Sequence, residues 1–496
     1  METNKESIKK NIVLNISATI AIGLLAFLVN RVFNDQLGQE QLGFLRLITQ
    51  MLAYLSLAEL GLGGAATALL FSSVNKNDIE KTSTVFNSTS QLYNNISVLI
   101  LLVGISSNIL LPYLIEEPSL TIHFIWSLYV VNVSISYRYA KYTILYTALN
   151  RVGYVQNVRN IIKISTIILQ IVSLIVLKSF LVFVFLLIIS TCLEFYIFRR
   201  FYEKNLNDYI FSTKERSLDL IAKTKQLFVH KIASVLVFNT DYIVIVKFIG
   251  LKEIAIYSSY LLITRFIDTI YSSIFLVIKP QIAKFYHGND QASNREVVSI
   301  IISVNSFFSS LISVAMFLYI VDFVSIWMGE EYSLSITSVL LICLNFFVSM
   351  FRRPIDLIKD VAGYFKDINL PVLEGILNLS LSIILVHNLG LNGVLIGTLI
   401  SNSLVIVLLK PYVVYRDVLG NGYGEYLIKT IKIFVLMFVL GYVCYILKNR
   451  IEPTFASFLL VNMIVFICNI FLYAIFDKDF RVSASRYFND FWISKK

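Results

Sequence analysis

The stretch IVLNISATIAIGLLAFLVNRVF, Ile12–Phe33, holds a single charged residue, Arg31, near its end. A helix needs about 20 predominantly apolar residues to cross the roughly 30 Å hydrocarbon core of a bilayer. Stretches of this kind recur about fourteen times along the chain, and the last of them is Ile451–Phe476. The sequence therefore predicts a polytopic membrane protein whose function depends on what passes through or between its helices.

The composition excludes a soluble globular protein. Of the 496 residues, 57% are hydrophobic and 15% are charged, and the mean hydropathy is +0.74. We expect an all-α integral membrane protein with about fourteen transmembrane helices. The predicted spans are 12–33, 42–72, 86–111, 121–145, 155–177, 180–198, 226–248, 254–278, 297–321, 334–351, 368–387, 391–409, 427–447 and 454–476.

The placement of basic residues predicts the orientation of the chain. The net charge is +10, and 34 of the 42 Lys and Arg residues fall in the two termini and in every second connection. Basic residues accumulate on the cytoplasmic side of membrane proteins. Both termini are therefore expected in the cytoplasm. This placement explains the basic excess without nucleic acid, and membrane lipids, anionic ones included, are the expected partners.

The chain also contains a weak internal repeat in its hydropathy. A shift of 212 residues places the first six predicted spans on the next six. Each half would begin in the cytoplasm, so the two six-helix lobes are predicted to be parallel and related by a pseudo-two-fold axis along the membrane normal. The predicted organisation is an N-lobe at 1–200, a cytoplasmic connector at 201–225, a C-lobe at 226–412, and two further spans with a cytoplasmic tail at 413–496.

Short motifs in a fixed order resemble those of a known family. The chain resembles bacterial polysaccharide flippases, which belong to the multidrug/oligosaccharidyl-lipid/polysaccharide exporter superfamily. The motifs cover nearly the whole chain: Asn30-Arg31-Val32-Phe33, Leu37-Gly38, Leu42-Gly43, Leu57-Ala58-Glu59-Leu60-Gly61-Leu62-Gly63, Asp241, Phe248-Ile249-Gly250, Ala255-Ile256-Tyr257-Ser258, Lys279-Pro280, Ala362-Gly363-Tyr364-Phe365-Lys366, Glu374, Asn378 and Gly390-Leu391-Asn392-Gly393-Val394.

The resemblance implies a function. It implies that the protein moves undecaprenyl-diphosphate-linked oligosaccharide repeat units from the cytoplasmic to the outer leaflet by rocking of two lobes, for O-antigen, capsule or exopolysaccharide assembly. It further implies a polysaccharide polymerase and a chain-length regulator as partners. A diphosphate and many hydroxyls must then cross hydrocarbon while the polyprenyl tail stays in lipid, so we expect a hydrated, cationic cavity.

Three arginines are candidates for that cavity, because a cation near mid-bilayer costs about 2.5–3.5 kcal/mol on insertion scales. Arg265 lies well inside a predicted span and precedes Asp268 by three residues, so either it binds phosphate or the two side chains neutralise each other. Arg46 and Arg31 lie nearer the outer ends of their spans, where snorkelling to the interface is an equal alternative.

A second set of basic residues occurs at corresponding positions of the two halves. Under the 212-residue shift, Lys141 falls on Arg353, with Arg138 and Arg352 close by. These clusters would flank an inward-facing mouth and attract a diphosphate, or they belong to the ordinary cytoplasmic belt of basic residues. Tyrosines lie between them and would serve as interfacial anchors or stack on sugar rings: Tyr137, Tyr139, Tyr142 and Tyr146.

Three carboxylates within the spans are candidates for ion coupling. Asp241 would bind a proton or sodium ion, or pair with Lys247 or Arg265. Glu59 is followed by a glycine-rich stretch that permits close helix approach or local bending. Asp268 is the third candidate.

Signals for an enzyme or a cofactor are absent from the sequence. The four histidines have no metal-ligand spacing, and there is no GxxxxGK[ST] phosphate loop, so we expect neither cofactor nor catalytic residue. The outer connections are too short for the large loop of a membrane-bound polymerase or ligase. Two functions besides the flipping of lipid-linked oligosaccharides stay open. One is a small-molecule cation antiporter of the same superfamily, which the carboxylates within the spans would suit, and the second is a lipid II flippase.

Overall fold

The computed structural model describes residues 2–55, 59, 61–115, 118–206, 210–211, 215, 217–222, 224, 240–364, 366–367, 369–450 and 455–483. All regular elements within these ranges are helices, which confirms the predicted all-α fold class. The chain divides into two compact units, the N-terminal unit Met1–Ala255 and the C-terminal unit Ile256–Lys496. Each unit is described by itself.

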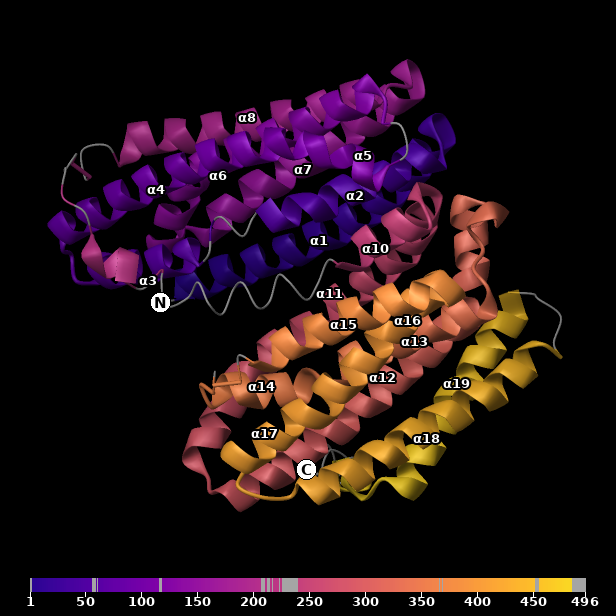
Figure 1. Cartoon of the computed structure of the whole chain (residues 1–496). Helices are drawn as coiled ribbons and strands as arrows, with labels where there is room; N and C mark the ends of the chain where they lie inside the picture. Colours follow the sequence, from indigo (N-terminus) through magenta and orange to yellow (C-terminus); the bar gives the residue numbers. More distant parts are fainter. Residues whose placement is uncertain are drawn as a thin grey trace. The chain divides into compact units, whose positions relative to one another are not determined.

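The N-terminal unit is a bundle of long helices in which α4, α6 and α8 lie side by side, and α1 packs on α7 (Figure 1). The short helix α10 packs on α2 and α5. Its elements are α1 (Glu2–Leu37), α2 (Gln39–Leu55), α3 (Leu62–Asn75), α4 (Ile79–Ser106), η2 (Ser107–Leu110), α5 (Leu111–Leu114), α6 (Leu120–Ala148), α7 (Val152–Leu177), α8 (Phe180–Asn205) and α10 (Thr240–Phe248).

The C-terminal unit is built around α12, which contacts α13, α14, α18 and α19 (Figure 1). Helix α11 (Leu251–Gly288) begins just before the unit boundary and continues into it. The other elements are α12 (Gln291–Met328), η3 (Glu330–Tyr332), α13 (Ile336–Phe351), α14 (Arg353–Val361), α15 (Asn369–Leu389), α16 (Leu391–Asn402), the π-helical η4 (Ser403–Leu409), α17 (Lys410–Asp417), α18 (Tyr423–Lys448) and α19 (Phe455–Phe476).

Twelve helical spans in the described residues are long and apolar enough to cross a membrane, so the prediction of a multi-pass membrane protein is confirmed. Their lipid-facing character shows in large apolar side chains that stay exposed in mid-helix, such as Leu169 (53%), Ile189 (60%) and Met463 (59%). Two predicted spans are not among the twelve. Span 226–248 lies largely outside the described residues, which resume at Thr240.

The other missing span, 42–72, is divided into two helices. Helix α2 ends at Leu55 and α3 begins at Leu62, and Gly61 between them has a φ of 85°, in the left-handed region that favours glycine. Gly61 thus precedes α3 in a backbone conformation that other residues rarely adopt.

Part of the predicted connector is described, and it lies against α4. The Phe211 carbonyl accepts a hydrogen bond from the Asn87 amide at 3.0 Å, and the Ser217 amide donates to Ser88 at 2.9 Å. An exposed ion pair joins Lys81 to Asp219 at 3.2 Å. The rest of the connector, including residues 207–209 and 212–214, lies outside the described residues.

We predict that Gly393→Ala destabilises the C-terminal unit. Helices α15 and α16 pack tightly after a sharp turn at Gly390, where φ is 54°, and a Cβ at position 393 would overlap the Leu385 carbonyl and approach the Val386 nitrogen to 2.8 Å. We expect a loss of about 1–3 kcal/mol in the free energy of unfolding, seen as a lower thermal midpoint of the purified protein in detergent.

Gly424→Ala is the matched control, because a Cβ there meets nothing within 4 Å. Its thermal midpoint should stay the same or rise slightly, as expected for Gly→Ala inside a helix. Equal midpoints for both variants would show that the α15–α16 contact is not as close as described.

Candidate functional site

A polar face between α4 and α6 brings together two of the predicted inner-mouth residues. Ser90 and Ser97 lie seven residues apart on one face of α4, and Arg138 and Lys141 lie three apart on one face of α6. The Arg138 Nε donates to the Ser97 hydroxyl at 3.3 Å, and the Lys141 Nζ donates to the Ser90 hydroxyl at 2.8 Å. We call these four residues the serine–cation face.

The two cations of the serine–cation face have no carboxylate partner within the described residues. Arg138 is exposed and Lys141 is partly buried. The third cation nearby, Arg199, forms an ion pair with Glu203 at 2.8 Å. Neutral hydroxyls therefore satisfy hydrogen bonds of Arg138 and Lys141 but leave their positive charge uncompensated.

The four tyrosines near these cations are buried, so they pack inside the N-terminal unit. Tyr137, Tyr139, Tyr142 and Tyr146 are all 9% exposed or less. The Tyr139 hydroxyl donates to Glu194 on α8 at 2.6 Å, and the Tyr146 hydroxyl donates to the Phe198 carbonyl at 2.6 Å. Tyr139 and Tyr146 thus fasten α6 to α8, and burial makes all four tyrosines unavailable for stacking on a sugar in this conformation.

Glu59 is held by α4. Its Oε1 accepts a hydrogen bond from the Tyr93 hydroxyl at 2.7 Å, and the Tyr93 ring stacks on Tyr137 of α6 with centroids 6.1 Å apart. Gly63 makes this bond possible, because a Cβ there would come within 3.0 Å of the Tyr93 hydroxyl and still nearer the Glu59 carboxylate. Gly63 therefore leaves the space that the Tyr93 hydroxyl needs to reach the Glu59 carboxylate.

The two outer arginines and Asp241 belong to other helices of the same unit. Arg31 pairs with Asp35 at 2.9 Å, with both side chains more than a third exposed. Arg46 of α2 donates to the buried Asn30 amide oxygen of α1. Asp241, in the first turn of α10, lies within electrostatic reach of Tyr54 on α2. The structure therefore does not bring these three residues to the serine–cation face.

In the C-terminal unit, Asp268 pairs with Arg353 and not with its helix neighbour Arg265. The Arg353 guanidinium of α14 donates to the Asp268 carboxylate of α11. The Arg265 side chain is exposed and has no ion-pair partner among the described residues. The local neutralisation of Arg265 by Asp268 is thus absent, and Arg265 stays a candidate for an external anion.

Arg352 belongs to a charge network that the sequence did not reveal. Its Nε lies 2.7 Å from Asp356, and the same carboxylate also pairs with Lys410 at the start of α17. Glu374 of α15, which is 7% exposed, lies within electrostatic reach of both cations. The four-residue spacing from Arg352 to Asp356 is a sequence signal for their ion pair, because it places both on one helix face. No local pattern indicates the pair between Asp356 and Lys410, which lie far apart in the sequence.

The two predicted inner-mouth clusters therefore differ in their chemistry. In the N-terminal unit the cations contact serines, while in the C-terminal unit Arg352 and Arg353 contact carboxylates. Two further pairs nearby, Lys359–Asp367 at 2.6 Å and Lys279–Asp360 at 2.8 Å, extend the balanced pattern. The cations on α6 are thus uncompensated by carboxylates among the described residues, whereas Arg352 and Arg353 are compensated.

Buried polar side chains also join α15 to α16. The Asn378 amide donates to the Thr398 hydroxyl at 3.3 Å, and the Ser382 hydroxyl donates to the Asn378 oxygen at 3.2 Å. Asn378 and Ser382 are 5% and 0% exposed. In the part of the chain that the structure describes, no group of three or more His, Cys, Asp or Glu side chains is placed to hold a metal ion.

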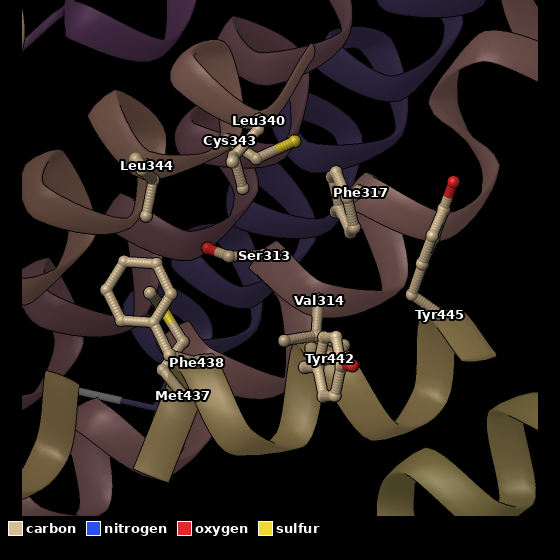
Figure 2. A pocket seen from close by; sticks show the side chains of 11 residues that line it. Ser313, Val314, Phe317, Leu340, Cys343, Leu344, Met437, Phe438, Tyr442 and Tyr445 are labelled. Carbon is tan, nitrogen blue, oxygen red and sulfur yellow. The ribbon is translucent and has the colours of Figure 1, made fainter. Parts of the chain in front are cut away.

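An apolar pocket of about 190 Å³ lies between α12, α13 and α18 (Figure 2). Aromatic side chains surround it, including Phe317, Phe438, Tyr442 and Tyr445. The buried Ser313 hydroxyl on its wall has no hydrogen-bond partner among the described residues. A sugar or phosphate bound here would lose its hydrogen bonds to water and find few partners on the apolar walls. The pocket therefore suits hydrocarbon.

These features define the class of protein: a multi-pass helical membrane protein. The chain belongs to the polysaccharide biosynthesis protein family, whose model matches residues 8–286. No curated protein matched the sequence.

Solved structures of the multidrug and flippase superfamily share the fold. The lipid II flippase MurJ, in an inward-closed conformation, has a TM-score of 0.68 at 15% identity, covering 94% of this chain and 99% of its own. An inward-facing multidrug resistance MATE transporter of the MOP superfamily has a TM-score of 0.59 at 14% identity, covering 89% and 99%. The Vibrio cholerae MATE transporter VcmN has a TM-score of 0.54 at 16% identity, covering 84% and 99%. The family and these relatives are transporters and flippases, not enzymes.

We predict that Asp356→Asn destabilises the protein because it leaves Arg352 and Lys410 without their shared carboxylate. Breaking a buried ion pair costs about 3–5 kcal/mol. The Asp356 side chain is 31% exposed, so we expect about 2–3 kcal/mol, measured as a lower thermal midpoint in detergent.

Two further variants make this prediction specific. Adding Lys410→Met to Asp356→Asn should recover part of the lost midpoint, since one uncompensated cation is removed. Asp35→Asn breaks an exposed pair and should cost no more than about 1 kcal/mol. A larger loss for Asp35→Asn than for Asp356→Asn would contradict the network.

Proposed function

We propose that this protein is a flippase that moves undecaprenyl-diphosphate-linked oligosaccharide repeat units from the cytoplasmic to the outer leaflet. Membership of the polysaccharide biosynthesis protein family and a fold shared with a lipid II flippase support this proposal. The product would be a surface polysaccharide such as O-antigen or capsule. A polymerase and a chain-length regulator would then be the partners that act after it.

The observation that carries the proposal is the serine–cation face. A diphosphate brings two or more negative charges, and charge-assisted hydrogen bonds are roughly twice as strong as neutral ones. Arg138 and Lys141 now bond neutral serines, so exchanging Ser97 and Ser90 for phosphate oxygens gains Coulomb energy without breaking an ion pair. The Arg138 fork also matches two phosphate oxygens at once.

The other candidate cations take different roles in this proposal. Arg265 is exposed on α11 without a carboxylate partner among the described residues, so it serves as the second anion contact, on the C-terminal unit. Arg352 and Arg353 stabilise that unit through Asp356 and Asp268. Arg31 contacts Asp35 and Arg46 contacts Asn30, and we assign neither a direct contact with the diphosphate.

The transport cycle would be alternating access between the two halves of the chain. Both termini would lie in the cytoplasm of a bacterial inner membrane, as the distribution of Lys and Arg predicts. Asp241, Glu59 and Asp268 are the candidates for ion coupling. An ion bound at Glu59 would act on a helix contact, because the Tyr93 hydroxyl of α4 donates to the Glu59 carboxylate.

A second candidate function is supported by the fold. The shared fold with MurJ over 94% of this chain suits a lipid II flippase, whose cargo is also a lipid-linked diphosphate. The serine–cation face fits both cargoes. An antiporter for cationic drugs is less favoured, since Arg138, Lys141 and Arg265 would repel its cargo.

We predict that Arg138→Gln and Lys141→Gln each reduce transport at least tenfold while the protein still reaches the membrane. Each change removes one charged donor to phosphate, worth about 1.5–3 kcal/mol for a hydrogen bond to a charged group. The measurement is the appearance of lipid-linked repeat units in the outer leaflet of cells that carry each variant in place of the wild type.

Arg200→Gln is the matched control, because Arg200 is an exposed cation on α8 with no ion-pair partner among the described residues. It should transport at the wild-type rate. Deletion of the gene should abolish outer-leaflet repeat units. A deletion strain with normal surface polysaccharide and failing peptidoglycan would instead support the lipid II function, and changed drug susceptibility alone would support an antiporter.

A further inference from the structure

A polar pocket of about 300 Å³ lies at one end of the C-terminal unit. Its walls come from the first few turns of α12 and α18 and from residues just after α19. These positions are helix ends that the basic residues of the sequence assign to the cytoplasmic interface. The flippase proposal uses none of these residues.

A closed hydrogen-bond network forms the floor of the pocket. The Lys429 Nζ donates to Asp479 at 2.5 Å and to the carbonyl and hydroxyl of Ser299 at 2.7 and 2.8 Å. The Ser299 hydroxyl also donates to Asp479, at 2.5 Å. Burial alone would raise the pKa of Asp479, but its bonds from Lys429 and Ser299 hold that pKa below the ordinary value, so the floor is an ion pair with no net charge.

The rest of the wall carries charges of both signs. Arg295 donates to the neutral Leu419 carbonyl at 2.8 Å and keeps its positive charge, and the other cations are Lys432 and Lys478, both exposed. The other anions are Glu425, which is exposed, and Asp477. A pocket with three cations and two anions offers partners to both ends of a zwitterion, whereas a simple anion would leave the two carboxylates without a cation from the ligand.

Hydrogen bonds to one oxygen hold the Asp477 carboxylate in place, and its other oxygen can still accept a hydrogen bond. Its Oδ1 accepts from the Ser303 hydroxyl at 2.9 Å and from the amides of Asp479 and Phe480 at 3.0 and 3.1 Å. Its Oδ2 is buried and has no hydrogen-bond partner among the described residues. The residue is 7% exposed and has no ion-pair partner there. Asp477 and Glu425 therefore give the pocket two carboxylates that can attract a cationic group.

The surroundings of the pocket indicate a lipid and not a soluble molecule. Ile428 and Phe476 line it and are 59% and 57% exposed, as expected for side chains that face hydrocarbon. Acyl chains could lie over these two residues while the headgroup occupies the charged part. We propose that this pocket binds the headgroup of an aminophospholipid such as phosphatidylethanolamine, with its phosphate at Lys432 and Lys478 and its primary ammonium at Glu425.

The chemistry discriminates among common headgroups. A primary ammonium donates three hydrogen bonds, whereas the methylated ammonium of phosphatidylcholine has no N–H to donate. Phosphatidylglycerol offers phosphate without a cation, so Glu425 and Asp477 would gain no partner from it. The proposed order of binding is therefore phosphatidylethanolamine above both phosphatidylglycerol and phosphatidylcholine.

The test uses the full-length protein purified in detergent, with each of these three lipids added at equal mole fraction and retention counted by native mass spectrometry. Phosphatidylethanolamine should be retained in excess. Lys432→Gln and Glu425→Gln should each lower its retention about two- to fivefold, the range for a partly exposed charge pair. Glu425→Gln should also raise the retention of phosphatidylglycerol, since one repelling charge is removed.

Both substitutions fall on exposed side chains, so unfolding does not confound them. Lys284→Gln, at an exposed lysine of α11 outside the pocket, should change nothing. Equal retention of all three lipids by the wild type, or unchanged selectivity in Glu425→Gln, would overturn the proposal. Displacement of the lipid by millimolar soluble phosphoethanolamine would overturn the role given to the acyl chains.

Discussion

A charge placed among membrane helices must be balanced, hydrated or able to reach the interface, and this constraint organises the described structure. Arg353 is balanced by Asp268, and Arg352 shares Asp356 with Lys410. Where a cation lacks a carboxylate, as Arg138 does among the described residues, it lies exposed beside hydroxyls. The cost of an unbalanced cation in hydrocarbon, a few kcal/mol on insertion scales, makes each exception a candidate for function.

The same constraint distinguishes basic residues that stabilise the fold from basic residues that can bind an anion. Repetition in sequence suggested that Lys141 and Arg353 are equivalent, yet one contacts a serine and the other a carboxylate. An ion pair already formed must be broken before its cation can bind phosphate, which costs much of the energy gained. A cation that contacts a hydroxyl loses far less. The partner of a basic residue therefore predicts its availability better than its position does.

The sequence predicted the helices well and the contacts poorly, for a physical reason. Hydropathy over about twenty residues reports a crossing directly, so the spans were readable. Bends and partners depend on residues that are distant in the chain. Arg265 and Asp268 share a helix face, yet Asp268 pairs with Arg353, 85 residues away, which no local pattern reveals. The break at Gly61 was visible as a glycine-rich stretch, but its left-handed φ was not.

Glycine and serine have related roles in this bundle, since both allow groups to approach closely without adding charge. Gly63 leaves space for the bond between Tyr93 and Glu59, and Ser97 joins α4 to α6 through the Ser134 carbonyl at 2.8 Å while also accepting from Arg138. A hydroxyl can therefore hold two helices together and keep a cation in place with weak, exchangeable bonds. A transporter needs this combination, because a cation fixed by a strong partner cannot release or receive its cargo.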